Sequence, residues 1–129
     1  MSASPREVAH RLVQGISEER WTELPDLYAE DTVVELPFSP EPAMLRGRTE
    51  IAAHFAAAAD RPLRVKAKNV VVHETIDPEV VVVEFDYDVD AQGRSGTVAN
   101  VAVIRVRDGR ILSSRDYHDH RAIATIVAG

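Results

Sequence analysis

Apolar residues recur at helical spacing along the first half of the chain. Val8, Leu12 and Ile16 follow Ser4 and Pro5, which suit the cap and the first turn of a helix. Two later segments repeat the spacing, the second within an alanine-rich, strongly helix-forming stretch. The predicted elements of this half are helices over residues 5–16, 21–28 and 48–59, a strand over Thr32–Phe38 and a loop over Ser39–Gly47.

The second half of the chain changes to runs of β-branched residues. Turn signals divide these runs into four consecutive strands, at Asp77-Pro78, Gln92-Gly93 and Asp108-Gly109. Helices followed by consecutive strands are typical of an α+β fold, in which an antiparallel sheet carries helices on one face. A length of 129 residues suits one domain, so we take residues 1–129 as a single unit.

Charged residues come opposite one another across the first of these hairpins. Folding the chain at its turn places three cations against three acids, namely Arg64, Lys66 and Lys68 against Asp90, Asp88 and Asp86. We therefore interpret the acidic run over residues 84–90 as a solvated ion-pair face. It is not interpreted as a carboxylate cluster for catalysis or Mg²⁺ binding.

Successive residues of a strand point to opposite faces, so the residues that alternate with these charges are expected to face inward. They are Asn69, Val71 and His73, then Val83, Phe85 and Tyr87, then Asn100, Ala102 and Ile104. The last hairpin leaves two registers open, because a shift of one residue exchanges the two faces. A two-residue Asp108-Gly109 turn directs Asp116 outward. A three-residue loop ending at Gly109 as a bulge residue directs Asp116 and His118 inward and puts Asn100 beside Asp116.

Composition narrows the classes of function. The absence of cysteine excludes disulfides, a thiol nucleophile and cysteine metal sites, and it fits a reducing cytoplasm. The formal net charge of -6 argues against nucleic acid as a partner. No apolar run is long enough to cross a bilayer, and the polar first residues do not form a signal peptide, so we expect no membrane association and a cytoplasmic location.

The segment RDYHDH, residues 115–120, carries the densest candidate chemistry. On an extended strand Asp116, His118 and His120 point the same way, which is a possible set of three metal ligands. A second ligand pair is missing, and His120 falls where the strand is expected to end in solvent. We therefore expect no metal and no other cofactor. His10 and His54 are expected to be exposed.

Three stretches together resemble the SnoaL-like branch of the nuclear-transport-factor-2-like superfamily: ERWTELPDLYAEDTVVELPF, LRGRTEIAAHF and VIRVRDGRILSSRDYHD. The resemblance covers nearly the whole chain. It implies a curved antiparallel sheet wrapped around three helices, cone-shaped with a central pocket, and a homodimer formed through the sheet. It also implies the inward register of Asp116 and hence the bulged turn.

The resemblance implies a site as well. Asp116 matches an acid/base aspartate of cyclase and epoxide-hydrolase relatives, and His118 would be its catalytic partner. The expected ligand is a small, largely apolar compound with a carbonyl or hydroxyl group, undergoing isomerisation, cyclisation, dehydration or hydration. The expected substrate-binding residues are Asn100, Tyr28, Phe38, Trp21, Asn69 and Tyr87, although core packing is the favoured interpretation of Trp21.

Departures from the family pattern exclude two specific activities. The catalytic positions of the steroid isomerases fall on Leu12, Leu36 and Ala102. The inward arginine that epoxide hydrolases need is missing from residues 80–90. Two non-catalytic interpretations stay open: a domain that binds a hydrophobic ligand, and a dimeric interaction module with Val101 and Val103 in its interface.

Overall fold

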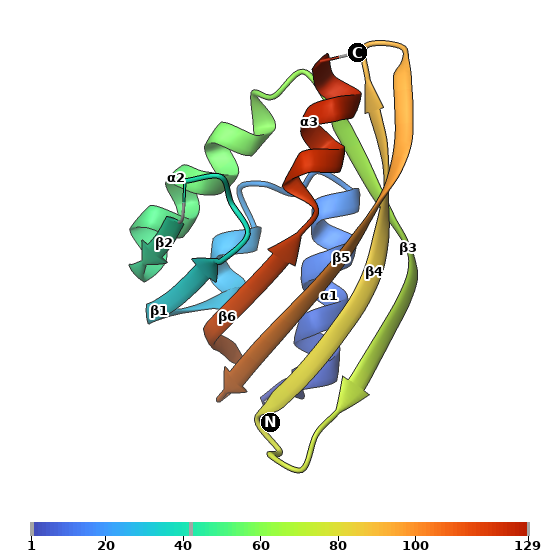
Figure 1. The fold of residues 1–129 in the computed structure, drawn as a ribbon. Coiled ribbons are helices and arrows are strands. Elements are labelled where there is room, and N and C mark those ends of the chain that lie inside the picture. The colour runs from blue at the N-terminus through green and yellow to red at the C-terminus, as the bar shows by residue number, and fades with distance from the viewer. Residues whose placement is uncertain (1, 42, 129) are drawn as a thin grey trace.

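The computed structural model describes residues 2–41 and 43–128, and its elements follow the expected order with three exceptions (Figure 1). The helices are α1 (Pro5–Ser17), the short 3₁₀ turn η1 (Leu24–Leu27), α2 (Gly47–Ala59) and α3 (His120–Ala128). The strands are β1 (Tyr28–Leu36), β2 (Ala43–Arg46), β3 (Arg64–Glu74), β4 (Val80–Ala91), β5 (Arg94–Arg107) and β6 (Arg110–His118).

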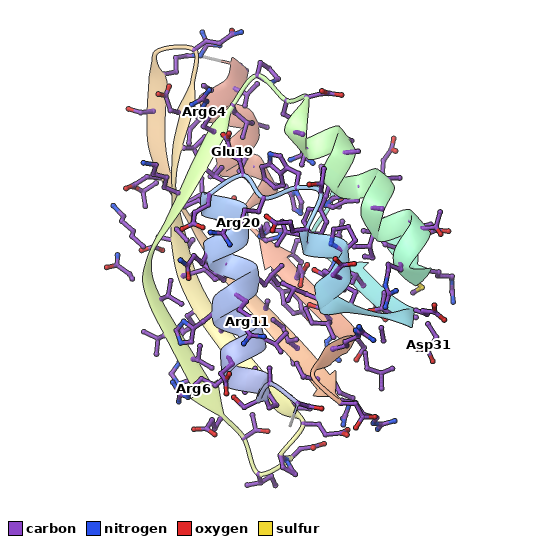
Figure 2. The ribbon with its side chains drawn as sticks, turned by 180° about the vertical axis from the view of Figure 1, so that it is seen from behind. Arg6, Arg11, Glu19, Arg20, Asp31 and Arg64 are labelled. Carbon is purple, nitrogen blue, oxygen red and sulfur yellow. The ribbon has the colours of Figure 1, made fainter. Side chains whose placement is uncertain are left out.

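All six strands form one curved, open sheet in the order β2-β1-β6-β5-β4-β3. The pairs are antiparallel except for β1 and β6, which run parallel, so the sheet is mixed rather than purely antiparallel. Hairpin logic does not constrain this pair because the two strands are far apart in the sequence. Seen from behind, α1 and α2 cover one face of the sheet (Figure 2). α3 packs on β4 and β5.

The expected second helix over residues 21–28 is wrong. Only the single turn η1 forms there, and Tyr28 already has the extended backbone of β1, with φ -106° and ψ 145°. Pro25 lies in the first turn of η1, and the β-branched run that follows pairs with β6 and β2, which extends the chain. The strand therefore begins at Tyr28 and ends at Leu36, before the expected Phe38.

Two other expectations for chain segments are corrected. The expected loop over Ser39–Gly47 contains the edge strand β2, which pairs with β1. The helix α3 was not expected at all. It begins directly after Asp119, whose carboxylate accepts a hydrogen bond from the backbone N–H of Ala122 at 2.9 Å, as an N-cap does. His120 is thus the first residue of a helix and not the solvated end of a strand.

The ion-pair register of the first hairpin is confirmed. Arg64, Lys66 and Lys68 lie opposite Asp90, Asp88 and Asp86, and Lys68 Nζ is 2.8 Å from the Asp88 carboxylate. The register then shifts between Lys68 and Val71.

This shift overturns the inward expectation for the rest of β3. Asn69 has a left-handed φ of 55°, and the bulge moves one residue out of step. Val71 and His73 consequently face outward, where His73 contacts Glu84. Asn69 lies on the same outer face and donates a hydrogen bond to the Asp86 carboxylate at 3.0 Å.

The last hairpin combines a tight turn with a bulge elsewhere. Asp108 and Gly109 have φ of 52° and 76° and form a two-residue turn that pairs Arg107 with Arg110, so the three-residue loop is wrong. Arg105 pairs with Ser113 and Val106 with Ile111, which leaves Leu112 as the extra residue of a bulge. That bulge restores the inward direction of Asp116, as the resemblance implied.

The inward parity of β4 and β5 is confirmed, and it builds the core. Val83, Phe85, Tyr87, Asn100, Ala102 and Ile104 are all buried. They pack beneath Val8 and Leu12 of α1 and Ile51 and Phe55 of α2, which also are buried. Within the part of the chain that the structure describes, no helix is long and apolar enough to span a membrane.

Candidate functional site

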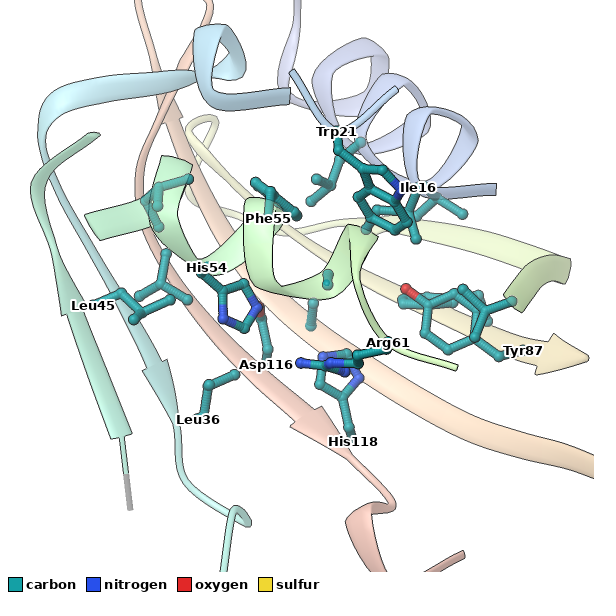
Figure 3. Close-up of a pocket in the computed structure, with 18 of the residues that line it drawn as sticks. Ile16, Trp21, Leu36, Leu45, His54, Phe55, Arg61, Tyr87, Asp116 and His118 are labelled. Carbon is teal, nitrogen blue, oxygen red and sulfur yellow. The ribbon is translucent and has the colours of Figure 1, made fainter. Parts of the chain in front are cut away.

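A cavity of about 140 Å³ lies between the helices and the inner face of the sheet (Figure 3). Most of its wall is apolar, because α1 and α2 present their buried faces to it and β4 and β5 present alternate residues. The apolar and aromatic lining residues include Leu12, Ile16, Trp21, Leu36, Leu45, Ile51, Phe55, Leu63, Val83, Phe85, Ala102 and Ile123. The polar lining side chains are Tyr28, His54, Arg61, Tyr87, Asp116 and His118.

Asp116 lies at the polar end of this cavity. It sits on β6 opposite Ala102, whose small side chain leaves the carboxyl group open to the cavity. Ser114 Oγ donates a hydrogen bond to Asp116 Oδ1. Burial raises the pKa of Asp116, and the Ser114 hydrogen bond and the nearby His54 offset only part of that effect. The carboxyl group therefore holds its proton at a higher pH than an exposed aspartate does.

His118 is held by Asn100, its neighbour across β5. His118 Nδ1 lies 2.7 Å from Asn100 Oδ1, while Asn100 Nδ2 donates to the carbonyl of Val98 at 3.0 Å. Because the amide nitrogen is committed to a carbonyl, Asn100 Oδ1 can only accept, so His118 carries its proton on Nδ1 and leaves Nε2 free. The expectation that Asn100 stands beside Asp116 is wrong, because Asn100 pairs with His118 and Asp116 pairs with Ala102.

The imidazole of His118 is neutral near pH 7. Burial is the largest cause that lowers the pKa of His118 to about 4, and the nearby His120 and Arg61 add to it. The ring of Tyr87 stacks on that of His118 with centroids 6.3 Å apart and 27° between the planes. A neutral imidazole with a free Nε2 accepts hydrogen bonds rather than carrying charge.

Two buried tyrosines complete the polar end. Burial, reinforced by the Asp116 charge, raises the pKa of Tyr28 and of Tyr87 above the usual tyrosine value. Both hydroxyls therefore stay protonated and can donate hydrogen bonds. Trp21 stacks on Phe55 with ring centroids 6.2 Å apart, so it belongs to the core and lines the cavity at the same time.

The structure brings five of the eight expected site residues to the cavity wall: Asp116, His118, Tyr28, Trp21 and Tyr87. Asn100 is buried behind His118. Phe38 and Asn69 do not belong to this cavity. Phe38 is 66% exposed and packs edge-on against Tyr117, which points to the outer face, because the chain turns away after Leu36.

Two polar lining residues, His54 and Arg61, were not predicted to belong to the site. His54 was expected to be exposed, but it lines the cavity, and burial lowers the pKa of its imidazole. A signal was present, since Ile51, His54, Phe55 and Ala58 share one helical face. Arg61 follows the end of α2, and Figure 3 shows its side chain extending to the polar end of the cavity. No periodic pattern marks Arg61.

His120 lies just beyond this site. Its ring is 5.8 Å from that of His118, and among residues 2–41 and 43–128 its buried Nε2 has no hydrogen-bond partner. Across the same described residues, no three histidine and carboxylate side chains are grouped so as to hold a metal ion.

Comparisons with known proteins agree with this architecture. The model of the SnoaL-like domain family matches residues 9–114. An uncharacterized PhzA/B-like protein of Pseudomonas aeruginosa is 35% identical over 96 residues, covering 71% of this chain and 67% of that protein. The uncharacterized protein YesE of Bacillus subtilis is 34% identical over 116 residues, covering 84% of this chain and 75% of that protein.

Solved structures share the fold at lower sequence identity. A proposed isomerase of Bacillus subtilis superposes with a TM-score of 0.87 at 24% identity, covering 96% of this chain and 92% of that one. An epoxide hydrolase of M. tuberculosis superposes with a TM-score of 0.72 at 19% identity, covering 96% and 89%. These neighbours have the nuclear-transport-factor-2-like fold. The chain belongs to the SnoaL-like family.

Proposed function

We propose that this protein is an enzyme that moves a proton on a small, largely apolar compound bearing a carbonyl or hydroxyl group. The observation that carries the proposal is the position of Asp116, a half-buried carboxyl group that faces an apolar cavity and whose pKa is raised by desolvation. A carboxyl group whose pKa lies nearer to neutral is suited to both removing and returning a proton. Isomerisation, aldol-type cyclisation and dehydration all need such a group.

The neighbours of Asp116 divide the remaining tasks. In its carboxylate form Asp116 takes a proton from the carbon next to a carbonyl group, and the resulting carboxylic acid returns that proton to another atom of the same compound. Tyr28 and Tyr87 keep their protons and donate hydrogen bonds to the oxygen on which negative charge develops. The free Nε2 of His118 accepts a hydrogen bond from a substrate hydroxyl.

The size of the cavity limits the compound. A volume of about 140 Å³ is close to that of an engineered cavity, roughly 150 Å³, that takes up benzene. One six-membered ring therefore fills the enclosed part, and larger fused-ring compounds do not fit inside it. The missing inward arginine on β4, whose inner face carries only Val81, Val83, Phe85, Tyr87, Val89 and Ala91, speaks against epoxide hydrolysis.

Solvent deuterium exchange tests this proposal even while the natural substrate is unidentified. Small cyclic ketones are incubated with the protein in D₂O, and loss of the signal from the hydrogens next to the carbonyl is followed by proton NMR. We expect at least one ketone to exchange about 100-fold faster with the natural protein than with Asp116→Asn, the usual scale of acid–base catalysis. Asp31→Asn is the matched control, since Asp31 is exposed on β1 and lies outside the cavity lining.

A second candidate function is binding without catalysis, which the predominantly apolar wall favours. The same samples separate the two functions. If ketones shift the indole N–H signal of Trp21 but exchange no faster than with Asp116→Asn, the protein binds without catalysing and the proposed chemistry is wrong.

We also propose that the outer face of the sheet forms a homodimer. Val71 is 48% exposed, and Val82, Val101 and Val103 are partly exposed on the same face. Apolar side chains gathered on a sheet face support an interface. Light scattering after gel filtration is expected to give twice the monomer mass, and Val103→Glu to give the monomer. A natural protein that stays monomeric at high concentration contradicts this proposal.

A further inference from the structure

Among the described residues that line the cavity, Arg61 is the one with a permanent charge. The other ionisable lining groups are Asp116, His54, His118 and two tyrosines, and none of them is a lysine or arginine. Arg61 follows α2, and its guanidinium lies at the polar end of the cavity near Asp116 and His118 (Figure 3). A fixed positive charge therefore stands where a bound compound would carry its polar group.

Nothing in the described part of the chain neutralises this charge. The ion pairs there tie up other arginines, such as Arg64 with Glu19 at 3.7 Å and Arg105 with Glu79 at 2.9 Å, but none involves Arg61. Arg48, at the start of α2, instead donates to the carbonyl of Tyr28 at 2.8 Å. The Arg61 guanidinium thus keeps its donors for a group that enters from outside.

The ionisable groups near Arg61 are three histidines and Asp116, and for each of them burial favours the uncharged form. Its charge helps to lower the pKa of His54, of His118 and of His120, so these imidazoles are uncharged near pH 7. Within residues 2–41 and 43–128, the only lining carboxyl group is that of Asp116, and its burial favours the protonated form. Arg61 therefore places a full positive charge at the polar end of the cavity in every protonation state of Asp116. Its electrostatic complement is a single negative charge.

The net charge of the whole protein does not favour the binding of anions. Its formal net charge is -6, which repels anions at long range. Any preference for an anion must therefore come from the cavity itself, and its origin can be assigned to one residue by mutation.

We propose that the compound bound in this cavity carries a carboxylate, which Arg61 binds while the apolar part fills the enclosed volume. A guanidinium matches a carboxylate with two parallel hydrogen bonds, which fixes orientation as well as position. This inference rests on the proposed function for its use: the carboxylate at Arg61 holds the carbonyl or hydroxyl group toward Asp116 and His118. The substrate class is then a monocyclic or similarly small keto or hydroxy acid.

Binding of benzoate and benzamide tests the inference. Both consist of one six-membered ring with a planar substituent of similar shape, and only benzoate is charged. Trp21 is the only tryptophan of the chain and lines the cavity, so its fluorescence and its indole N–H signal report binding directly. We expect benzoate to bind about tenfold more tightly than benzamide, as a charge-assisted pair allows.

Two variants assign the preference to a residue. Arg61→Gln is expected to bind benzoate and benzamide equally. Arg64→Gln removes the same charge from a side chain that pairs with Glu19 outside the cavity (Figure 2), and it is expected to keep the preference for benzoate. Both positions are exposed, so both variants should fold, which circular dichroism checks.

Three results would overturn the inference: equal affinities in the natural protein, no saturable binding of benzoate, or a preference for benzoate that survives in Arg61→Gln. The exchange assay above uses uncharged ketones and reads proton transfer, whereas this assay reads binding. Failure of one therefore leaves the other standing. Benzoate selectivity without exchange would point to an acid-binding protein, and exchange without selectivity to an enzyme for neutral compounds.

Discussion

Both faces of this sheet carry aspartate residues, but the pKa of Asp88 on the outer face is lowered and that of Asp116 on the inner face is raised. Asp88 on the outer face of β4 pairs with Lys68, and that hydrogen bond lowers the pKa of its carboxyl group. Asp116 on the inner face of β6 has a raised pKa because it is buried. Residue type therefore does not decide which carboxyl group has a raised pKa in this fold. The parity of its position along the strand does.

The outer face also carries an ion-pair network centred on Glu79. Glu79 accepts hydrogen bonds from both Arg105 and Arg107, and these bonds lower the pKa of Glu79 to about 2. Such a group is ionised at any ordinary pH and is ill suited to carrying a proton. On the inner face, burial instead favours the uncharged forms of Asp116 and His118.

The largest contrast is expected in stability, between adjacent residues of β5. Ile104 is fully buried on the inner face, and Ile104→Ala should lower the free energy of unfolding by about 2–5 kcal/mol, because it removes packed atoms and leaves a cavity. Val103→Ala on the partly exposed outer face should cost clearly less. Urea denaturation measures both. Equal losses would mean that the outer face is as tightly packed as the core.

A smaller contrast is expected in how stability depends on pH. The pKa of Asp116 in the folded protein lies above its ordinary value of 3.8, so its ionisation costs stability as pH rises through the folded pKa. Asp116→Asn should therefore be more stable than the natural protein at neutral pH, by about 1.4 kcal/mol for each unit by which the pKa is raised. The difference should vanish below pH 3.8.

Asp88→Asn provides the opposite slope. The pKa of Asp88 is lowered, so its carboxylate stabilises the fold above pH 3.8, and this stabilisation is lost as pH falls through the folded pKa. The variant should be only slightly less stable than the natural protein at neutral pH, because the pair with Lys68 is exposed to solvent, and equal to it in strong acid. Thermal unfolding across pH checks both variants, and parallel curves would remove the distinction between the faces.

The protonation of His118 gives a third, local contrast. The pKa of His118 is about 4, so folding disfavours its charged form, and stability falls as pH drops from 6.5 toward 4. Asn100→Asp should raise the pKa of His118 by more than about one unit, since a carboxylate favours the imidazolium. NMR titration of the imidazole measures the shift. Asn100→Ser, which retains an acceptor without charge, is the control, and a shift of equal size in it would contradict the electrostatic cause.

The smallest effect is expected on the outer face. Lys68 is well exposed, and its ion pair with Asp88 is screened by solvent. Lys68→Ala should leave the melting temperature almost unchanged, and any change should shrink further in high salt. A large loss would show that this ion pair anchors the bulge at Asn69 and thereby the register of β3.

Local sequence patterns were sufficient to predict most of the helices and strands, but not which side chains of each strand face the cavity. Opposite charges predicted the pairing of Arg64 with Asp90, because cross-strand attraction depends only on the turn position. The bulge directly after Lys68 could not be predicted, since its only signal is an asparagine that tolerates a positive φ. Asn69, Val71 and His73 were consequently placed on the wrong face.

The site was predictable where residues follow a strand or a helix periodically. Asp116, His118 and Tyr87 were found because alternation along β4 and β6, with the family resemblance, places them inward. Phe38 was misplaced because its direction depends on the turn after β1. Arg61 was missed because it lies between elements, where position depends on how α2 packs and not on any sequence period.

The extra residue Leu112 decides what an alignment of this strand means. Before Leu112 the register of β6 against β5 pairs Ile111 with Val106. After Leu112 the register is shifted by one residue, and this shift brings Asp116 rather than Tyr117 to the cavity. A relative that lacks this one residue would present the alternate set of side chains to its ligand, with every letter of its RDY-like segment unchanged. A single-residue insertion or deletion at this point is thus an evolutionary switch, able to create or erase an active site without substituting any residue in it.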